Sequence, residues 1–229
     1  MKVSVIANSE ESDLGLLLTG LDVATDDVSV HYRQDFRSWK FGGSTDLFVH
    51  LGSSWSVYWE SVRINVDAES SLMQTSVSRG VPVLGICFGA QVLSHAFGGV
   101  VARGKKTEIG WHTVSPVDQV PELSGRWMQW HYDSFSSPPG FETLAFNDAG
   151  VQAIQRGRSL GVQFHPEANE AIVTRWMEGD GAAELAALGL SPQELLDETR
   201  REVMRTEKAT TELMRWFLET VAQSPFLAS

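Results

Sequence analysis

Cysteine is almost absent from this sequence of 229 residues, in which Cys87 is the only one. A single thiol cannot form a disulfide within the chain or build a cysteine-based metal site. Long hydrophobic runs are also missing. No segment reaches the roughly 18 apolar residues of a membrane-spanning helix, and the apolar stretch before Asn8 is too short for a signal peptide. We therefore expect a cytoplasmic protein with no membrane partner.

Positive charge is scarce as well. The chain has 18 lysines and arginines against 29 aspartates and glutamates, which gives a formal net charge of -11. Such a surface repels phosphate backbones, so we expect no nucleic-acid partner. The one short basic run, Arg103–Lys106, is interpreted as a solvated turn. With 42% apolar and 21% charged residues the composition is that of an ordinary globular protein.

The first half of the sequence alternates between strand-like and helix-like segments. Short β-rich runs lie at Lys2–Ala7, Val28–Tyr32, Asp46–Leu51 and Val81–Ile86, and helix candidates lie between them at Asp13–Leu21 and Glu60–Arg79. The last two β-rich runs are mostly apolar, as strands buried on both faces are. Strands that alternate with helices predict a parallel sheet with right-handed crossovers.

After a third helical run, Ala90–Phe97, the strand candidates follow one another closely. They lie at Ile109–Val117, Arg126–His131, Glu142–Asn147, Val151–Arg156 and Ser159–Phe164. Short links between them predict hairpins and antiparallel pairing. The expected fold class is therefore α/β, with an open, mostly parallel, flavodoxin-like sheet, helices on both faces and an antiparallel extension.

The C-terminal part of the chain is rich in Ala, Leu, Glu and Arg. Ser191, Pro192 and Glu194 supply an N-cap, a first-turn proline and a capping-box acid, which predict one or two helices over Ser191–Val221. Their interrupted apolar stripe favours packing on the parent domain over packing on a partner. The expected units are a domain at residues 1–177 and a helical extension on it at residues 178–229.

The first motif that carries chemistry is the end of the Val81–Ile86 strand. There Cys87 stands between Gly85 and Gly89, just before a helix. This layout predicts a nucleophile elbow, in which a strained strand-to-helix turn presents the thiol at the helix N-terminus and the N–H of Phe88 can bind an oxyanion. The alternative is a small buried hydrophobe, the commoner role of an isolated cysteine.

The second motif is a histidine, a proline and an acid that follow an apolar run. An imidazole at His165 suits both removal of a thiol proton and its return to a leaving amine. A carboxylate at Glu167 can orient that imidazole and stabilise its charged form, and Pro166 restricts the backbone between them. Taken alone, such a tripeptide at a strand end also fits an ordinary turn.

Together the two motifs closely resemble those of the class I, or triad, glutamine amidotransferases. The G-x-C-x-G-x-Q elbow is present as Gly85, Cys87, Gly89 and Gln91, and the later H-P-E as His165, Pro166 and Glu167. The resemblance covers Met1 to about Trp176. It implies that Cys87, His165 and Glu167 form a catalytic triad, and that the cysteine forms a γ-glutamyl thioester and releases ammonia.

The resemblance also implies roles for weaker positions. Gly52 falls where the family has its glycine-rich oxyanion loop, although Ser53–Ser54 replaces the usual Gly-Pro and leaves the donating N–H open. Gln91 would help to hold substrate. The segment with His131 and Tyr132 is similar to the His-Gly-Asp of GMP-synthetase-like members, with Tyr132 in place of the glycine, and both residues are expected at the substrate.

These observations predict an enzyme that acts on glutamine or another γ-glutamyl small molecule, and the chemistry needs no metal or organic cofactor. The favoured use is a stand-alone γ-glutamyl hydrolase or transferase, and the alternative is a glutaminase subunit that feeds a separate synthetase or amine-acceptor partner. A catalytically silent binding module of the same fold and a cysteine peptidase are rival readings. The amine half of the substrate, the oligomeric state and any covering of the site by the C-terminal helices stay open.

Overall fold

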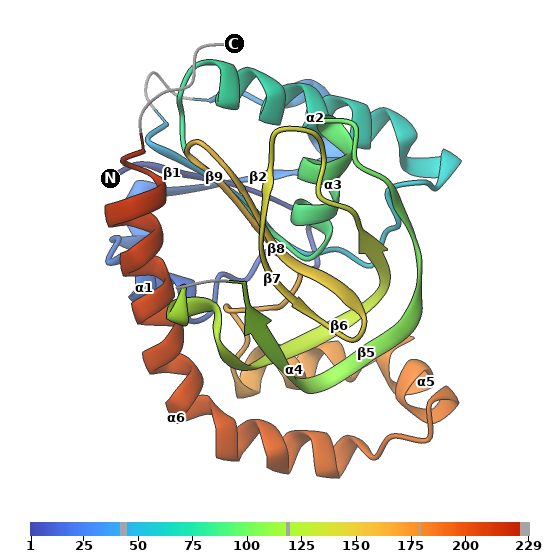
Figure 1. The fold of residues 1–229 in the computed structure, drawn as a ribbon. Coiled ribbons are helices and arrows are strands. Elements are labelled where there is room, and N and C mark those ends of the chain that lie inside the picture. Colours follow the sequence, from blue (N-terminus) through green and yellow to red (C-terminus); the bar gives the residue numbers. More distant parts are fainter. Residues whose placement is uncertain (42–44, 118–119, 179, 225–229) are drawn as a thin grey trace.

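The computed structural model describes residues 1–41, 45–117, 120–178 and 180–224. Within them a nine-stranded sheet runs in the order β2-β1-β3-β4-β9-β8-β7-β5-β6. The sheet is flanked by helices on both faces and curls into a long ribbon at one end (Figure 1). No described helix is long and apolar enough to cross a membrane.

The first five strands of this order are parallel. They are β2 (Val28–Tyr32), β1 (Val3–Ala7), β3 (Leu47–His50), β4 (Val83–Ile86) and β9 (Ser159–Val162). All residues of β1, β3, β4 and β9 are buried, because helices cover both faces of this half. The α/β class and the parallel core expected from the sequence are confirmed.

The other half of the sheet is antiparallel, as the closely spaced strand candidates predicted. Its strands are β8 (Gly150–Arg156), β7 (Glu142–Asn147), β5 (Val101–Pro116) and β6 (Gly125–Phe135). The interpretation of Arg103–Lys106 as a turn was wrong, because these residues lie inside β5. The pairing of β5 with β6 shifts register between Arg103 and Glu108, so the strand continues through the basic run while Arg103, Lys105 and Lys106 stay exposed.

The predicted helices are present, the first of them shortened, and α4 and α5 were not predicted. The helices are α1 (Leu17–Leu21), α2 (Arg63–Ser78), α3 (Phe88–Ala96), α4 (Glu170–Trp176), α5 (Asp180–Ala187) and α6 (Pro192–Trp216), with short turns η1 (Thr25–Asp27), η2 (Arg33–Ser38), η3 (Glu60–Val62), η4 (Pro121–Leu123) and η5 (Phe217–Val221). The expected helix at Asp13–Leu21 is shorter at its start. Gly15 has a φ of 45° and its N–H bonds to the Asp13 side chain, which gives a tight turn before the helix.

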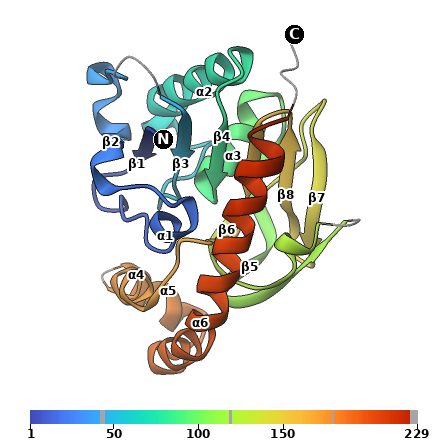
Figure 2. The same cartoon turned by 90° about the vertical axis from the view of Figure 1, so that its left-hand side faces the viewer.

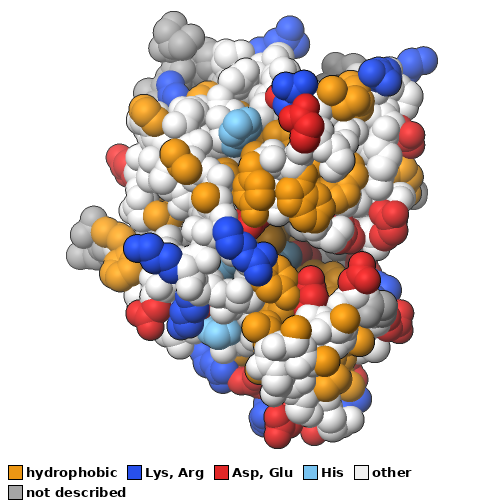
Figure 3. All heavy atoms as spheres, turned by 90° about the vertical axis from the view of Figure 1, so that its right-hand side faces the viewer, with side chains coloured by type: hydrophobic (Ala, Val, Ile, Leu, Met, Phe, Trp, Pro, Cys, Tyr) orange, Lys and Arg blue, Asp and Glu red, His pale blue; other side chains and the backbone are white. Residues whose placement is uncertain are grey.

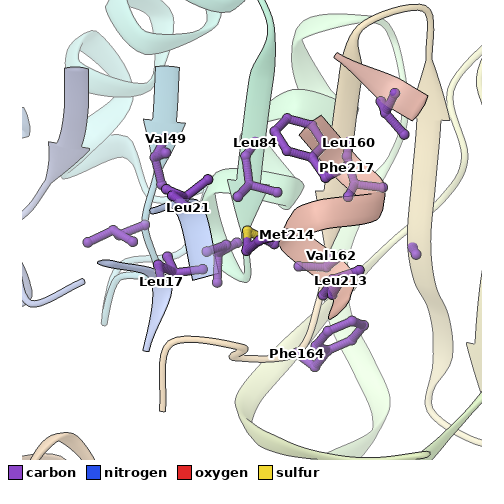
Figure 4. Close-up of a cluster of buried hydrophobic side chains, with 14 of the residues drawn as sticks. Leu17, Leu21, Val49, Leu84, Leu160, Val162, Phe164, Leu213, Met214 and Phe217 are labelled. Atoms are coloured by element: carbon purple, nitrogen blue, oxygen red, sulfur yellow. The ribbon is translucent and has the colours of Figure 1, made fainter. Parts of the chain in front are cut away.

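Two hydrophobic layers hold the helices on the sheet. On one face α1, α6 and η5 pack on the parallel strands, with Leu17, Met214 and Phe217 among the buried side chains (Figures 2 and 4). On the other face α2 and α3 bury Met73 and Phe88, among others. The cap of α6 is as predicted, with Ser191 accepting from the N–H of Glu194. The C-terminal helix therefore shares the core of the sheet, while a domain boundary at residue 177 stays a prediction.

Candidate active site

Cys87 lies in a sharp turn between β4 and α3. Its φ of 50° and ψ of -107° are unusual for a residue with a side chain. The turn needs its glycines: a Cβ at Gly89 would lie 2.1 Å from the carbonyl oxygen of His50, and one at Gly85 would lie 2.7 Å from that of Gly89. The strained strand-to-helix geometry expected from the sequence is therefore present, with Cys87 4% exposed.

His165 follows β9, and its backbone N–H bonds to Met128 of β6 at 2.9 Å. The ring nitrogen Nδ1 lies 2.6 Å from Oε1 of Glu167, and both side chains are buried. The other ring nitrogen, Nε2, has no hydrogen-bond partner among the described residues. One end of this imidazole is therefore fixed by an acid and the other is left open.

The backbone around His165 is held by two other parts of the chain. The hydroxyl of Thr210 on α6 donates to the carbonyl oxygen of Pro166 at 2.7 Å. The N–H of Leu16 donates to the carbonyl oxygen of Glu167 at 3.0 Å, and Gly15 passes so close that its Cβ would lie 2.1 Å from that oxygen. The turn that shortens α1 therefore serves the His-Pro-Glu segment.

Cys87 and His165 both lie next to Gly52. A Cβ built on Gly52 would lie 2.9 Å from Cε1 of His165 and 3.6 Å from Cβ of Cys87. No hydrogen bond of regular geometry joins the sulfur to Nε2, yet the sulfur is near enough to act on the ring. Burial lowers the pKa of His165, but the charges of Glu167 and Cys87 outweigh it and raise this pKa to about 10. The imidazole is therefore cationic at neutral pH.

The loop after β3 has few free donors left. The N–H of Leu51 bonds to Ile6, that of Ser54 to the Glu11 side chain, and that of Trp55 to Oγ of Ser53. The N–H groups of Gly52 and Ser53 have no such partner among the described residues. Across the site, the N–H of Phe88 opens α3, where the first N–H groups of a helix lack an intrahelical acceptor. These three N–H groups are the candidates for binding an oxyanion.

The comparisons with known proteins agree with this geometry. The model of the family described as glutamine amidotransferase class-I matches residues 61–172, which hold both Cys87 and His165. Residues 61–172, just under half of the chain, thus have the sequence of a class I glutamine amidotransferase domain. A glutamine amidotransferase from Thermotoga maritima has the same fold with a TM-score of 0.80 and 28% identity, over 98% of this chain and 100% of that one.

Two curated relatives of this amidotransferase are longer enzymes. The glutamine-hydrolysing GMP synthase of Thermomicrobium roseum is 43% identical over 96 residues, which are 38% of this chain and 18% of that enzyme. The GMP synthase of Aeropyrum pernix is 34% identical over 137 residues, which are 54% of this chain and 27% of that enzyme. The chain thus matches far less than two thirds of the length of these relatives.

Two other residues that were predicted at the substrate have partners within the protein. Gln91 is buried on α3, where its Nε2 lies 3.3 Å from Oε1 of Gln163 and 3.5 Å from the carbonyl oxygen of Asp133. His131 lies with Nε2 3.3 Å from Oε2 of Glu108, and its Nδ1 lies 3.0 Å from the carbonyl oxygen of Asp133. Neither side chain is hydrogen-bonded to Cys87, and a substrate-binding role for both stays a prediction.

Tyr132 has charged side chains as its neighbours. The guanidinium of Arg103 lies 4.2 Å from the centre of its ring, and burial and the charge of Glu184 raise its pKa. Glu184 of α5 accepts from the indole N–H of Trp130 at 2.7 Å. Figure 3 shows the face that carries α5, with hydrophobic side chains gathered in its middle above a hollow.

The sequence analysis missed two residues beside Cys87 and His165. The Nε2 of Gln163 lies 3.5 Å from Sγ of Cys87, and the ring of Trp176 on α4 packs edge-on against His165 with centroids 4.6 Å apart. Gln163 carried a signal, because it is a polar residue in an otherwise apolar run and stands two positions before His165. Trp176 carried none, since helix α4 was not expected.

Proposed function

We propose that the chain cleaves the side-chain amide of glutamine, or a related γ-glutamyl bond, through a thioester on Cys87. The support is the arrangement of His165, which Glu167 holds at Nδ1 while Nε2 is left without a partner beside Cys87. An imidazole held in this way can take the proton of the thiol and later return it to the leaving nitrogen.

In the first step the thiolate of Cys87 attacks the carbonyl carbon of the amide. The carbonyl oxygen becomes an oxyanion, for which the N–H groups of Phe88 and of Gly52 or Ser53 are the available donors. When the C–N bond breaks, the imidazolium of His165 gives its proton to the leaving nitrogen, so ammonia or an amine departs and the γ-glutamyl thioester remains.

In the second step water attacks the thioester. Neutral His165 takes a proton from the water, the C–S bond breaks, and the thiolate returns with glutamate released. Glu167 keeps the imidazole in one orientation and stabilises its charged form in both steps. An amine in place of water gives a transferase.

The partner protein is a second question. The relatives named glutamine-hydrolysing GMP synthase match this chain over only 18% to 27% of their lengths, so their remaining parts have no counterpart in the matched segments. The names of these relatives couple glutamine hydrolysis to a synthase, which supports the proposal that the ammonia is delivered to a synthetase. Full activity of the isolated chain on a γ-glutamyl amine would favour the stand-alone hydrolase or transferase instead.

The decisive experiment measures glutamate release from glutamine, γ-glutamyl peptides and γ-glutamyl amines, with Cys87→Ala as the control. Wild type should release glutamate from at least one substrate and the variant from none. Labelling by iodoacetamide gives a second readout, because a silent module leaves Cys87 unlabelled at neutral pH. Cleavage of ordinary peptides without γ-glutamyl cleavage would overturn the proposal in favour of a peptidase.

A further inference from the structure

Arg33 is a buried cation outside the triad. It begins the η2 turn after β2 and is only 1% exposed. A buried guanidinium is costly unless its N–H groups are all bonded and its charge is paired. Its Nε lies 2.7 Å and its Nη2 3.1 Å from the two oxygens of Glu69 on α2, which is itself fully buried. This fork pairs the charge and uses one side of the guanidinium.

The other side of the guanidinium binds the backbone of the loop after β3. Nη2 donates to the carbonyl oxygen of Leu51 at 2.7 Å, and Nη1 donates to that of Gly52 at 3.1 Å. The carbon of the guanidinium also lies 4.9 Å from the centre of the Phe88 ring. Arg33 thus contacts both backbone segments that hold the candidate oxyanion donors.

These contacts fix the direction of the free N–H groups. In a trans peptide the C=O and the following N–H point in opposite directions. Because the carbonyls of Leu51 and Gly52 point at Arg33, the N–H groups of Gly52 and Ser53 point away from it. Those are the two N–H groups of the loop that have no partner among the described residues, and Gly52 borders both Cys87 and His165.

The ionisation of the neighbouring groups stabilises the Arg33–Glu69 pair. Burial raises the pKa of Glu69, but the charge of Arg33 and the contact with His50 outweigh it, so the pKa lies below its usual value. Burial lowers the pKa of His50, whose Nδ1 lies 2.8 Å from Glu69. Glu69 is therefore ionised and His50 neutral, so the charge of Arg33 is balanced by that of Glu69.

We propose that Arg33 is a positioning residue for catalysis: paired with Glu69, it holds the carbonyls of Leu51 and Gly52 so that the N–H groups of Gly52 and Ser53 serve the oxyanion. This inference rests on the proposed function, because it assigns a role in the same reaction. A second anchor acts on the same loop, where Nδ2 of Asn8 donates to Oγ of Ser53 at 2.6 Å.

The test separates this role from that of a buried ion pair needed only for folding. In the double variant Arg33→Met with Glu69→Gln, no buried charge is left unpaired and the new side-chain amide can still accept from His50, but the fork to the loop is lost. The matched control is Arg158→Met, because Arg158 also ties two carbonyls, those of Gly80 and Ser224, away from the site.

Two rates are measured on each protein: kcat for glutamate release, and alkylation of Cys87 by iodoacetamide. Alkylation displaces iodide at a saturated carbon, so it needs the thiolate but no oxyanion donor. We expect the double variant to lose about 100-fold in kcat, the size of effect known for a lost oxyanion donor, with KM and alkylation unchanged. Arg158→Met should keep both rates.

Wild-type kcat in the folded double variant would overturn the proposal, and so would a parallel fall in alkylation, which places the damage in the thiol–imidazole pair. If the double variant does not fold, Arg33→Lys keeps the charge beside Glu69 without the fork, and it should again lose kcat alone. If wild type releases no glutamate, the proposed function itself fails. A crystal structure of the variant then decides the positioning role: carbonyls of residues 51 and 52 that keep their direction without Arg33 exclude it.

Discussion

Two buried histidine–glutamate pairs in this molecule have almost the same geometry and opposite electrostatics. Nδ1 lies 2.6 Å from the acid in His165–Glu167 and 2.8 Å from it in His50–Glu69. The pKa of His165 is raised to about 10, whereas that of His50 is lowered. Burial lowers both pKa values. It prevails at His50, where the charge of Arg33 lowers the pKa further, whereas the charges of Glu167 and Cys87 outweigh it at His165.

The comparison teaches that a histidine next to an acid is not by itself a catalytic pair. In the second pair burial lowers the pKa of His50 and the charge of Arg33 lowers it further, so the imidazole serves as a neutral hydrogen-bond donor to Glu69. In the first pair no described cation competes for Glu167, so its charge acts on His165. The pair His165–Glu167, in which the acid has no competing cation, is therefore the one suited to proton transfer.

The largest effect is expected when the sulfur of Cys87, beside His165, is removed. Cys87→Ala deletes the proposed nucleophile, so glutamate release should fall by about 10⁶-fold, as for other triad nucleophiles. The pKa of His165 should also fall, because the charge of Cys87 is one of its causes. Activity assays and an NMR titration of the imidazole measure the two effects. Residual activity, or an unchanged pKa, would contradict the assignment.

The second-largest effect is expected at Glu167, the acid that pairs with His165. Glu167→Gln keeps an acceptor for Nδ1 but removes the charge, so kcat should fall by about 10² to 10⁴. Because the folded pKa of His165 is above the unfolded value of 6.5, its proton is kept up to about pH 10 and is lost above it. Without Glu167 that loss should begin at lower pH. A kcat/KM profile against pH measures the shift, and a profile with the same alkaline limb would refute it.

A change in the second pair, His50–Glu69, should lower the stability of the fold. Glu69→Gln leaves the charge of Arg33 buried without a partner, so the free energy of unfolding should fall by about 3–5 kcal/mol. Urea denaturation measures this loss. The control is the double variant with Arg33→Met, in which no charge is stranded and most of the stability should return. Equal stability of the single and double variants would show that the charge pairing is not the cause.

The smallest effect is expected at a third pair, His131 and Glu108. Glu108 also accepts from Asn147, at 3.0 and 2.9 Å, so it keeps partners when the histidine is removed. His131→Gln should therefore lower the free energy of unfolding by only about 1 kcal/mol, with KM for the substrate unchanged. Thermal unfolding and steady-state kinetics measure the two. A raised KM would instead support the substrate-binding role that the family resemblance implied.

The sequence was most informative where the chemistry lies in one short segment. Gly85, Cys87 and Gly89 are neighbours in the chain, and the strained turn that they form needs nothing distant to be predicted. The same holds for His165 and Glu167, whose contact spans two residues. The parallel strands were also predictable, since burial on both faces leaves a continuous apolar run.

The remaining features depend on contacts between distant residues. Arg33 and Glu69 are 36 residues apart, and no periodicity connects them. The turn at Gly15 is set by the approach of Glu167, which the local helical pattern of Asp13–Leu21 does not contain. The basic run after Arg103 looked like a turn because its charges are solvated, but an edge of the ribbon keeps charges in water equally well.

The hydroxyl of Thr210 binds the carbonyl of Pro166, between the proposed base and its acid. A shortened chain that ended at Trp176 would retain every strand of the sheet and yet leave that carbonyl without its donor. The final helix thus supports the backbone between the proposed base and its acid, and a fragment chosen by strand content alone would omit it.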